Sequence, residues 1–168
     1  IKDYGYLLRG DPAYAEKAAA VSALARDIAE FVGHAGLPPA ESRGLTVAYH
    51  SACSLQHGQK ITDMPRRLLE QAGYRVLTPA EAHLCCGSAG TYNILQPEIA
   101  GQLGDRKVAN IERLGADVIA AGNIGCAMQI GQRTRTPVVH TVELLDWARG
   151  GPTPQAFATI PDMENKGT

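Results

Sequence analysis

The sequence predicts an α/β fold, a mostly parallel sheet of about four strands flanked by helices in a Rossmann-like three-layer arrangement. Short apolar, β-branched runs alternate along the chain with longer stretches of helical periodicity. This alternation is typical of parallel strands joined by right-handed crossovers. A length of 168 residues, 45% of them apolar, is enough for one good core. We expect a single domain over residues 1–151, with its core at residues 44–149.

The first predicted element is a helix over residues 11–33. Asp11 suits the N-cap and Pro12 the first helical position. Apolar residues then recur at steps of three and four, which defines one helical face; they are Tyr14, Ala18, Val21, Leu24, Ile28 and Phe31. A loop rich in Gly and Pro follows as far as Arg43.

The rest of the chain is expected to alternate strands and helices. The predicted strands are Leu45–Tyr49, Tyr74–Leu77, Asp117–Ala121 and Pro137–His140. The predicted helices are Asp63–Ala72, Pro97–Leu114 and Thr141–Trp147. Each of these helices is followed within a few residues by glycine, which commonly ends a helix. Residues 152–168 are rich in Pro and Thr and then polar, and we expect this tail to be loose.

Four cysteines follow the predicted strands. Cys53 comes just after the first strand and Cys126 just after the third, and the adjacent pair Cys85 and Cys86 follows the second after a longer loop. Because ligands of open parallel sheets bind beyond the carboxyl ends of the strands, we expect the four thiols to converge at one edge. Three or four thiolates are typical ligands of iron–sulfur clusters and of zinc.

Other interpretations of the cysteines explain the pattern less well. Burial as small apolar side chains suits one or two scattered cysteines, but not an adjacent pair with two more in loops at strand ends. Thiol–disulfide catalysis needs an exposed thiolate of low pKa, and no Lys or Arg adjoins the pair. A zinc site remains open beside the iron–sulfur site, because zinc takes the same tetrahedral set of thiolates.

Glycines and histidines beside the cysteines are candidates for supporting roles. Gly87, Gly90 and Gly125 are expected to let the backbone approach a metal group and direct N–H groups at its sulfur atoms. Three histidines lie within five residues of a cysteine, and any of them could be a zinc ligand or a hydrogen-bond donor; they are His50, His57 and His83. We favour His57, which stands beside Gly58 in a distinctive segment.

The charge balance excludes recruitment of nucleic acid or an anionic membrane by bulk charge, because the net charge is −1. The densest basic spots, Arg66-Arg67 and Arg106-Lys107, fall in predicted helices and are interpreted as solvated faces. No apolar run approaches the ~20 residues of a membrane span, and no signal peptide is recognisable. We therefore expect a reducing, cytoplasmic compartment, where clustered cysteines indicate metal or redox sites.

The segment from His50 to Leu145 resembles the cysteine-rich CCG domain, named for the triplet that is Cys85-Cys86-Gly87 here. That domain occurs in one of the subunits of heterodisulfide reductase, in anaerobic glycerol-3-phosphate dehydrogenase, in lactate-utilisation proteins and in the iron–sulfur subunit of glycolate oxidase. The segments that resemble the last family most are Ser54–Lys60, Ala82–Tyr92, Leu95–Glu98 and Asn123–Cys126, with Lys2–Gly5 and the first helix.

The resemblance implies an electron-transfer domain that holds a [4Fe–4S] cluster on Cys53, Cys85, Cys86 and Cys126. Its partners would be the flavin-containing and other subunits of a glycolate oxidase complex, which oxidises glycolate and passes electrons to a quinone or other acceptor. Such a domain has no catalytic residues of its own, and its membrane association would be peripheral, through the complex at the inner face. A heterodisulfide-reductase-type or lactate-utilisation protein and a zinc-bound structural or interaction domain remain as alternatives, and the isolated domain could hold zinc or no metal.

Two departures from the family pattern limit what the resemblance implies. The full iron–sulfur subunit carries a ferredoxin-like region before two CCG halves, so this chain resembles the second half of a longer protein. The broader motif also ends in Cys-x-x-Cys, whereas Gln129 stands three residues after Cys126 here. The five-cysteine noncubane clusters of heterodisulfide reductase relatives therefore do not carry over, and four thiols fit one ordinary [4Fe–4S] cluster.

Overall fold

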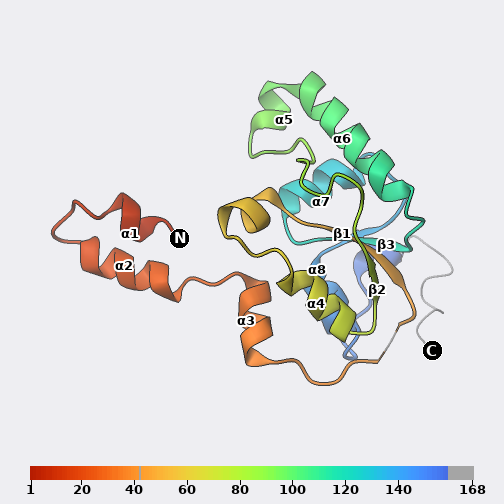
Figure 1. Cartoon of the computed structure of the whole chain (residues 1–168), viewed down its shortest axis with the longest axis horizontal. Helices are drawn as coiled ribbons and strands as arrows, with labels where there is room; N and C mark the ends of the chain where they lie inside the picture. Colours follow the sequence, from red (N-terminus) through yellow and green to blue (C-terminus); the bar gives the residue numbers. More distant parts are fainter. Residues whose placement is uncertain (42, 159–168) are drawn as a thin grey trace. The chain divides into compact units, whose positions relative to one another are not determined.

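A computed structural model describes residues 1–41 and 43–158 of the chain (Figure 1). The chain divides into two compact units, Ile1–Leu37 and Pro38–Thr168. This boundary lies inside the single domain that the sequence predicts over residues 1–151. All the strands belong to the second unit.

The first unit contains three short helices, α1 (Tyr4–Leu7), α2 (Ala15–Leu24) and α3 (Ile28–Ala35). The expected single helix over residues 11–33 is therefore wrong in its continuity. Extended backbone at Ala25 and Asp27, with ψ angles of 125° and 150°, separates α2 from α3. The apolar residues keep a helical spacing across this break, which is why the periodicity alone predicts one helix.

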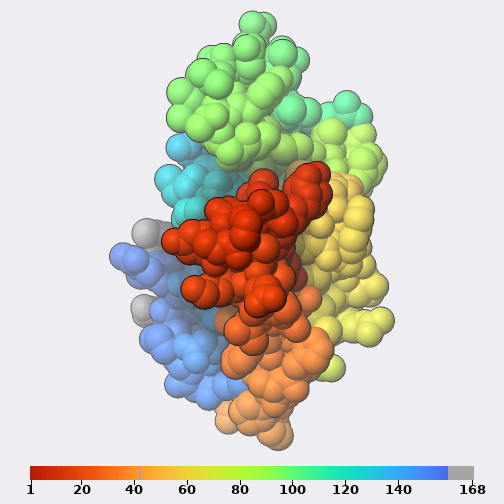
Figure 2. All heavy atoms as spheres, turned by 90° about the vertical axis from the view of Figure 1, so that its left-hand side faces the viewer, coloured from red at the N-terminus to blue at the C-terminus, as the bar shows by residue number. Residues whose placement is uncertain are grey.

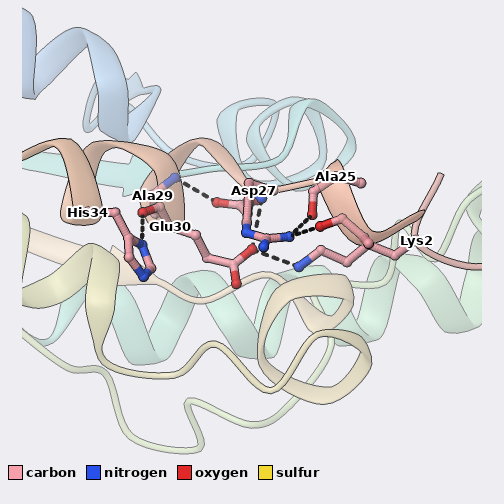
Figure 3. Close-up of polar contacts among 8 residues, drawn as sticks. Lys2, Ala25, Asp27, Ala29, Glu30 and His34 are labelled. Atoms are coloured by element: carbon pink, nitrogen blue, oxygen red, sulfur yellow. Dashed lines mark hydrogen bonds and ion pairs between the residues drawn. The ribbon is translucent and has the colours of Figure 1, made fainter. Parts of the chain in front are cut away.

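A capping box at Asp27 explains the break (Figure 3). The Asp27 carboxylate accepts a hydrogen bond from the Ala29 amide at 2.9 Å, and the Glu30 carboxylate accepts one from the Asp27 amide at 2.9 Å. Lys2 Nζ lies 2.6 Å from the same Glu30 carboxylate. The hydrogen bond from Lys2, followed by that from the Asp27 backbone, holds the pKa of Glu30 below its ordinary value. The cap satisfies amides that a new helix leaves without partners, so a helix begins here.

The first unit buries very little apolar surface. Its buried helical residues are Ala18 and Ala29, whereas large side chains such as Tyr6, Leu24 and Phe31 are exposed. Polar contacts join α1 to α2, because Ser22 Oγ accepts from the Gly5 amide at 2.8 Å and donates to the Ile1 carbonyl at 3.0 Å. The unit is thus held largely by local hydrogen bonds.

The second unit is built on a parallel sheet of four strands in the order β2-β1-β3-β4. Its strands are β1 (Thr46–His50), β2 (Arg75–Leu77), β3 (Val118–Ala121) and β4 (Val138–Val139). Ala48 of β1 is in register with Leu77 of β2 and with Ile119 of β3. The chain passes from β1 to β2 on one side and then returns to the other side of β1. The strand order therefore reverses between β1 and β3, which makes this the switch point of the sheet.

Helices cover both faces of this sheet and confirm the predicted three-layer arrangement (Figure 1). One layer holds α4 (Met64–Gln71) and α8 (Thr141–Trp147), and the other holds α6 (Pro97–Glu112) and α7 (Ile124–Gly131). Ala48 and Ile119 pack into the core beneath α6 and α7. Because strand side chains alternate, Val47 and Val118 turn toward the opposite layer. Burial on both faces explains why these strands are continuously apolar rather than alternating.

In the second unit, the boundaries of the predicted strands and helices agree with the structure to within one or two residues, as is usual for helix and strand ends. Four further elements are not among those that the sequence predicts: the π-helix η1 (Ser54–Gly58) and the helices α1, α5 (Tyr92–Leu95) and α7. Both α7 and η1 begin immediately after short loops at strand ends, so they are integral to the site region. Among the described residues, no helix combines the length and apolar character needed to cross a bilayer.

The described part of the expected loose tail packs against the second unit. Gln155–Phe157 forms a 3-10 helix, η2, and the Phe157 side chain is 0% exposed. Its ring lies 5.2 Å from that of Trp147, in a tilted arrangement that aromatic pairs favour. The remainder of the tail, residues 159–168, lies outside the described residues.

We predict that Asp27→Ala destabilises α3 by about 1 kcal/mol, because the cap bond to the Ala29 amide is lost. Amide hydrogen exchange of the full chain should then show roughly fivefold lower protection in α3. Asp3→Ala is the matched control, because Asp3 is the N-cap residue of α1 but makes no side-chain cap bond. Equal protection of α3 in the wild type and Asp27→Ala would contradict this account of the break.

Candidate metal centre

The four cysteines reach the carboxyl edge of the sheet from three connecting segments. Cys53 is the N-cap residue of η1, three residues after β1 ends. Cys126 lies in the first turn of α7, which follows β3. Cys85 and Cys86 lie in the loop between β2 and α5. Two of the three segments therefore leave the sheet at the switch point between β1 and β3, as the placement of the cysteines after the strands predicts.

The structure arranges the four thiols as two neighbouring pairs, and of these cysteines only Cys86 and Cys126 belong to the one group of possible ligand atoms, completed by His50, that meets within 4.8 Å among the described residues. Cys53 and Cys85 form one hydrogen-bonded pair, and Cys86 and Cys126 form another. Charge interactions link Cys126 to all three other thiols. Cys86 and Cys126 are buried, whereas Cys53 and Cys85 are half-buried. The group thus has a buried side and a side nearer to solvent.

The thiols differ strongly in acidity. The hydrogen bond from Cys126, with smaller contributions from His50 and the Ser88 amide, lowers the pKa of Cys86 to about 4. The same hydrogen bond raises the pKa of Cys126, and burial adds to that rise. Burial, followed by the charge of Cys85, raises the pKa of Cys53. A metal that binds thiolates would therefore have to displace the protons of Cys53 and Cys126, whose ionisation the surroundings oppose.

Two glycines allow the Cys85-Cys86 loop to pack closely. Gly87 has φ +91°, and a Cβ atom there would overlap the carbonyl oxygen of Ala100 on α6. A Cβ atom at Gly125 would lie 2.8 Å from Ser88 Oγ. The Gly87 amide also donates to Cys85 Sγ at 3.3 Å. Gly90 has φ +68° but open space around it, so its backbone conformation, and not a close approach, requires glycine there.

His50, and not the favoured His57, lies at the thiols. The His50 side chain is 1% exposed, and one of its ring nitrogens lies within 4.8 Å of the sulfur atoms of Cys86 and Cys126. Neither ring nitrogen makes a well-formed hydrogen bond within the described residues. His57 and His83 are both exposed. In the sequence, the feature that indicates a buried His50 is its position at the end of a strand that is buried on both faces.

Lys107 corrects the interpretation of Arg106-Lys107 as a solvated face. The Lys107 side chain is 0% exposed, and its Nζ donates to the carbonyls of Glu81 and Ala82 at 2.9 and 3.3 Å. Burial lowers the pKa of Lys107, and the charges of Cys53, Cys86 and Cys85 oppose that shift. A buried cation therefore lies within the field of the thiols. Lys107 lies three residues after Gly104 and four before Ile111, on the buried side of α6. This helical spacing indicates burial, whereas the charge of the side chain suggests exposure.

Further polar contacts anchor the loop before the cysteine pair to α6. Glu81 has φ +52° and accepts hydrogen bonds from Arg106 Nε at 2.8 Å and from Asn110 Nδ2 at 2.8 Å. The hydrogen bond from Arg106, followed by that from Asn110, lowers the pKa of Glu81 to about 2. The carboxylate thus stays ionised, and the loop that carries Cys85 and Cys86 is held at its start.

Gln129 is a structural residue in this arrangement. It is buried, and its Nε2 donates to the Ala100 carbonyl at 3.0 Å. This is the carbonyl that Gly87 approaches. Gln129 therefore connects α7 to α6 and satisfies the oxygen against which the cysteine loop packs.

An α/β sheet with thiols gathered at its switch point and a Cys-Cys-Gly loop against α6 defines a class of cysteine-rich domain. The chain belongs to the cysteine-rich CCG domain family, which it matches over residues 47–131, about half of its length.

Among curated relatives, the chain is similar to the glycolate oxidase iron-sulfur subunit of Escherichia coli (strain K12), at 38% identity over 88% of this chain and 37% of that protein. It is also similar to lactate utilization protein A of Bacillus licheniformis, at 32% identity over 86% of this chain and 64% of that protein. An uncharacterized E. coli protein, YkgE, is 31% identical over 86% of this chain and 64% of its own length. The chain therefore spans less than two thirds of each of these relatives.

We predict that Gly87→Ala destabilises the chain more than Gly90→Ala. Both changes place a Cβ in the left-handed region, which costs about 1–2 kcal/mol. Gly87→Ala adds a collision with the Ala100 carbonyl, which should cost roughly a further 1–3 kcal/mol. Urea unfolding of the two variants measures the difference. Equal loss of stability would mean that the loop does not depend on its close approach to α6.

Proposed function

We propose that this chain is an iron–sulfur electron-transfer domain of a glycolate oxidase or glycolate dehydrogenase complex. The observation that supports the proposal is the meeting of buried Cys86 and Cys126 at the switch point of a CCG-family sheet, with Cys53 and Cys85 as a second pair beside them. Cys53, Cys85, Cys86 and Cys126 would hold a [4Fe–4S] cluster, which takes four cysteinates. The group would supply one-electron transfer, and the chain would supply its binding and its environment.

The residues around the thiols fit such a group. Gly87 lets the cysteine loop pack against the Ala100 carbonyl of α6, and Gly125 lets the start of α7 pack against Ser88 of the same loop. The buried ammonium of Lys107 offsets negative charge on the thiolates. Burial of Cys86 and Cys126 excludes water on one side, whereas the half-buried Cys53 and Cys85 leave the other side open to electron exchange. Burial and nearby hydrogen bonds are the means by which proteins set the reduction potentials of clusters.

The proposed partners are a flavin-containing subunit that oxidises glycolate and a carrier such as a quinone, reached through peripheral membrane association in the cytoplasm. The similarity to a protein named glycolate oxidase iron-sulfur subunit supports this assignment. Large apolar side chains are also exposed on α5 and α7, the helices that flank the cysteine loops; they are Ile94, Leu95, Ile124 and Met128. Figure 2 shows α5, in light green, and the start of α7, in cyan, on one face of this unit. Exposed apolar side chains of this kind are common at subunit interfaces.

A zinc-bound structural domain is the second candidate function. It is favoured by the convergence of His50, Cys86 and Cys126, since mixed histidine and cysteine sets are typical of structural zinc sites. Zinc has a filled d shell and performs no redox work, so colour and metal content separate the two candidates.

We predict that anaerobic reconstitution of the chain with iron and sulfide gives a brown protein with about four iron and four sulfide ions per chain. Cys86→Ser should lose most of the visible absorption, because it removes the most acidic thiol and a central ligand. Ser54→Ala is the matched control, since Ser54 is exposed and adjoins Cys53. A colourless chain that binds one zinc ion tightly and no iron would contradict the electron-transfer proposal in favour of the structural domain.

We also predict that Lys107→Gln lowers the reduction potential of the reconstituted chain. A buried positive charge stabilises the reduced group, which carries one more electron, so its removal should make reduction harder. Potentiometric titration followed by electron paramagnetic resonance measures the shift. Arg106→Gln removes a neighbouring but exposed charge from α6 and should shift the potential much less. Equal shifts in the two variants would exclude a special role for the buried ammonium.

A further inference from the structure

An imidazole shares the buried side of the thiol group. His50, Cys86 and Cys126 are all buried, and their possible ligand atoms lie within 4.8 Å of one another. They come from three different places in the chain: the end of β1, the loop after β2 and the first turn of α7. Such convergence of distant residues requires the tertiary fold and is not a property of one loop.

The His50 ring carries an unmet requirement for partners. Both Nδ1 and Nε2 are buried, and apart from the contact of the ring with the Cys86 thiol neither nitrogen has a hydrogen-bond partner among the described residues. Burial of an unpaired polar group costs free energy, and the great majority of such groups are satisfied. The ring lies close enough to Cys86 to help lower the pKa of that thiol, but this contact would use at most one nitrogen. A metal ion beside the two sulfur atoms would satisfy a nitrogen that the protein leaves free.

We propose that His50 is a metal ligand, binding through a ring nitrogen to the same metal group as Cys86 and Cys126. The inference rests on the proposed function and refines its ligand set, since His50 would take the place of one of the half-buried thiols, Cys53 or Cys85, which lie outside the converging group; it applies to iron, zinc or cobalt alike. The side-chain amide of Gln129, three residues after Cys126, is occupied by its hydrogen bond to the Ala100 carbonyl. His50 is therefore the side chain that we assign as the third buried ligand beside Cys86 and Cys126.

A nitrogen ligand has a chemical consequence for an iron–sulfur group. Imidazole is neutral, so it brings one negative charge fewer than a thiolate. In Rieske centres two histidines replace two cysteines on one iron, and the reduction potential lies well above that of all-cysteine plant-type ferredoxins. Ligation by His50 would shift the potential of this domain in the same direction.

Cobalt(II) added alone to the full chain tests the inference without any iron–sulfur chemistry. A histidine bound to cobalt(II) gives an exchangeable ring N–H proton resonance that is shifted far outside the normal proton NMR range. We expect this resonance in the wild type and in His57→Gln, which changes an exposed histidine of η1. His50→Gln should lose the resonance and bind cobalt roughly tenfold more weakly or worse.

Reconstitution with iron and sulfide in protein labelled with ¹⁵N-histidine provides the second measurement. Pulsed electron paramagnetic resonance of the reduced protein should show a strongly coupled histidine nitrogen that is absent in His50→Gln. If no iron cluster forms but the shifted cobalt resonance is present, the proposed function fails and the His50 inference stands. If the cluster forms and neither measurement detects a histidine nitrogen, the inference is overturned and the proposed function stands.

Two remaining outcomes are also decisive. Failure of the wild-type chain to bind cobalt would overturn the inference. Circular dichroism shows whether His50→Gln folds. If it does not, the ligand is assigned from the wild type, His57→Gln and His83→Gln. A shifted resonance that is present in all three excludes the other histidines near the cysteines and supports His50. Loss of the resonance in His57→Gln would assign the ligand to His57 and overturn the inference for His50.

Discussion

The loop between β2 and α5 has to lie directly against α6, and the thiol group depends on that contact. The contact has three parts. Gly87 meets the Ala100 carbonyl with no side chain between them, the Lys107 ammonium holds the carbonyls of Glu81 and Ala82, and Arg106 pairs with the Glu81 carboxylate. Together they fix the loop on both sides of Cys85 and Cys86. Without them the sheet would still deliver Cys53 and Cys126 to its edge, but the adjacent pair would have no reason to face them.

Lys107 and the thiols form a mutually dependent electrostatic unit. Burial of an ammonium destabilises its charged form, and burial of thiolates does the same for theirs. When the ammonium and the thiolates lie near each other, each lowers the free-energy cost of burying the other. This compensation is complete only when the thiols are ionised. The lowered pKa of Cys86 and the raised pKa of Cys126 both arise first from the hydrogen bond between the two thiols. Binding of the proposed metal group would displace the proton that this pair holds.

The two units of the chain are stabilised in different ways. The sheet unit buries continuous apolar strands between two helix layers, and most of its free energy of folding comes from that burial. The first unit buries little more than two alanines and relies on caps and ion pairs such as that between Lys2 and Glu30. Exposed ion pairs contribute little to the free energy of folding. The stability of the first unit is therefore more sensitive to single substitutions in its caps than that of the sheet unit.

Local pattern in the sequence determined the α/β class, the strand and helix positions and the edge at which the cysteines meet, because periodicity and glycine stops are written in neighbouring residues. The same local reasoning joined α2 to α3, since the apolar stripe continues across the Asp27 cap, and it placed Lys107 in solvent because of its charge. Only the tertiary structure decided that His50 lies beside Cys86 and Cys126 and that Lys107 is buried. The physical reason is distance along the chain: the carbonyls that satisfy Lys107 lie about 25 residues before it, and the sulfur atoms near His50 come from two other segments. The burial and partners of a polar side chain depend on which segments, distant in the sequence, pack against it. The local pattern of a single sequence does not reveal these long-range contacts.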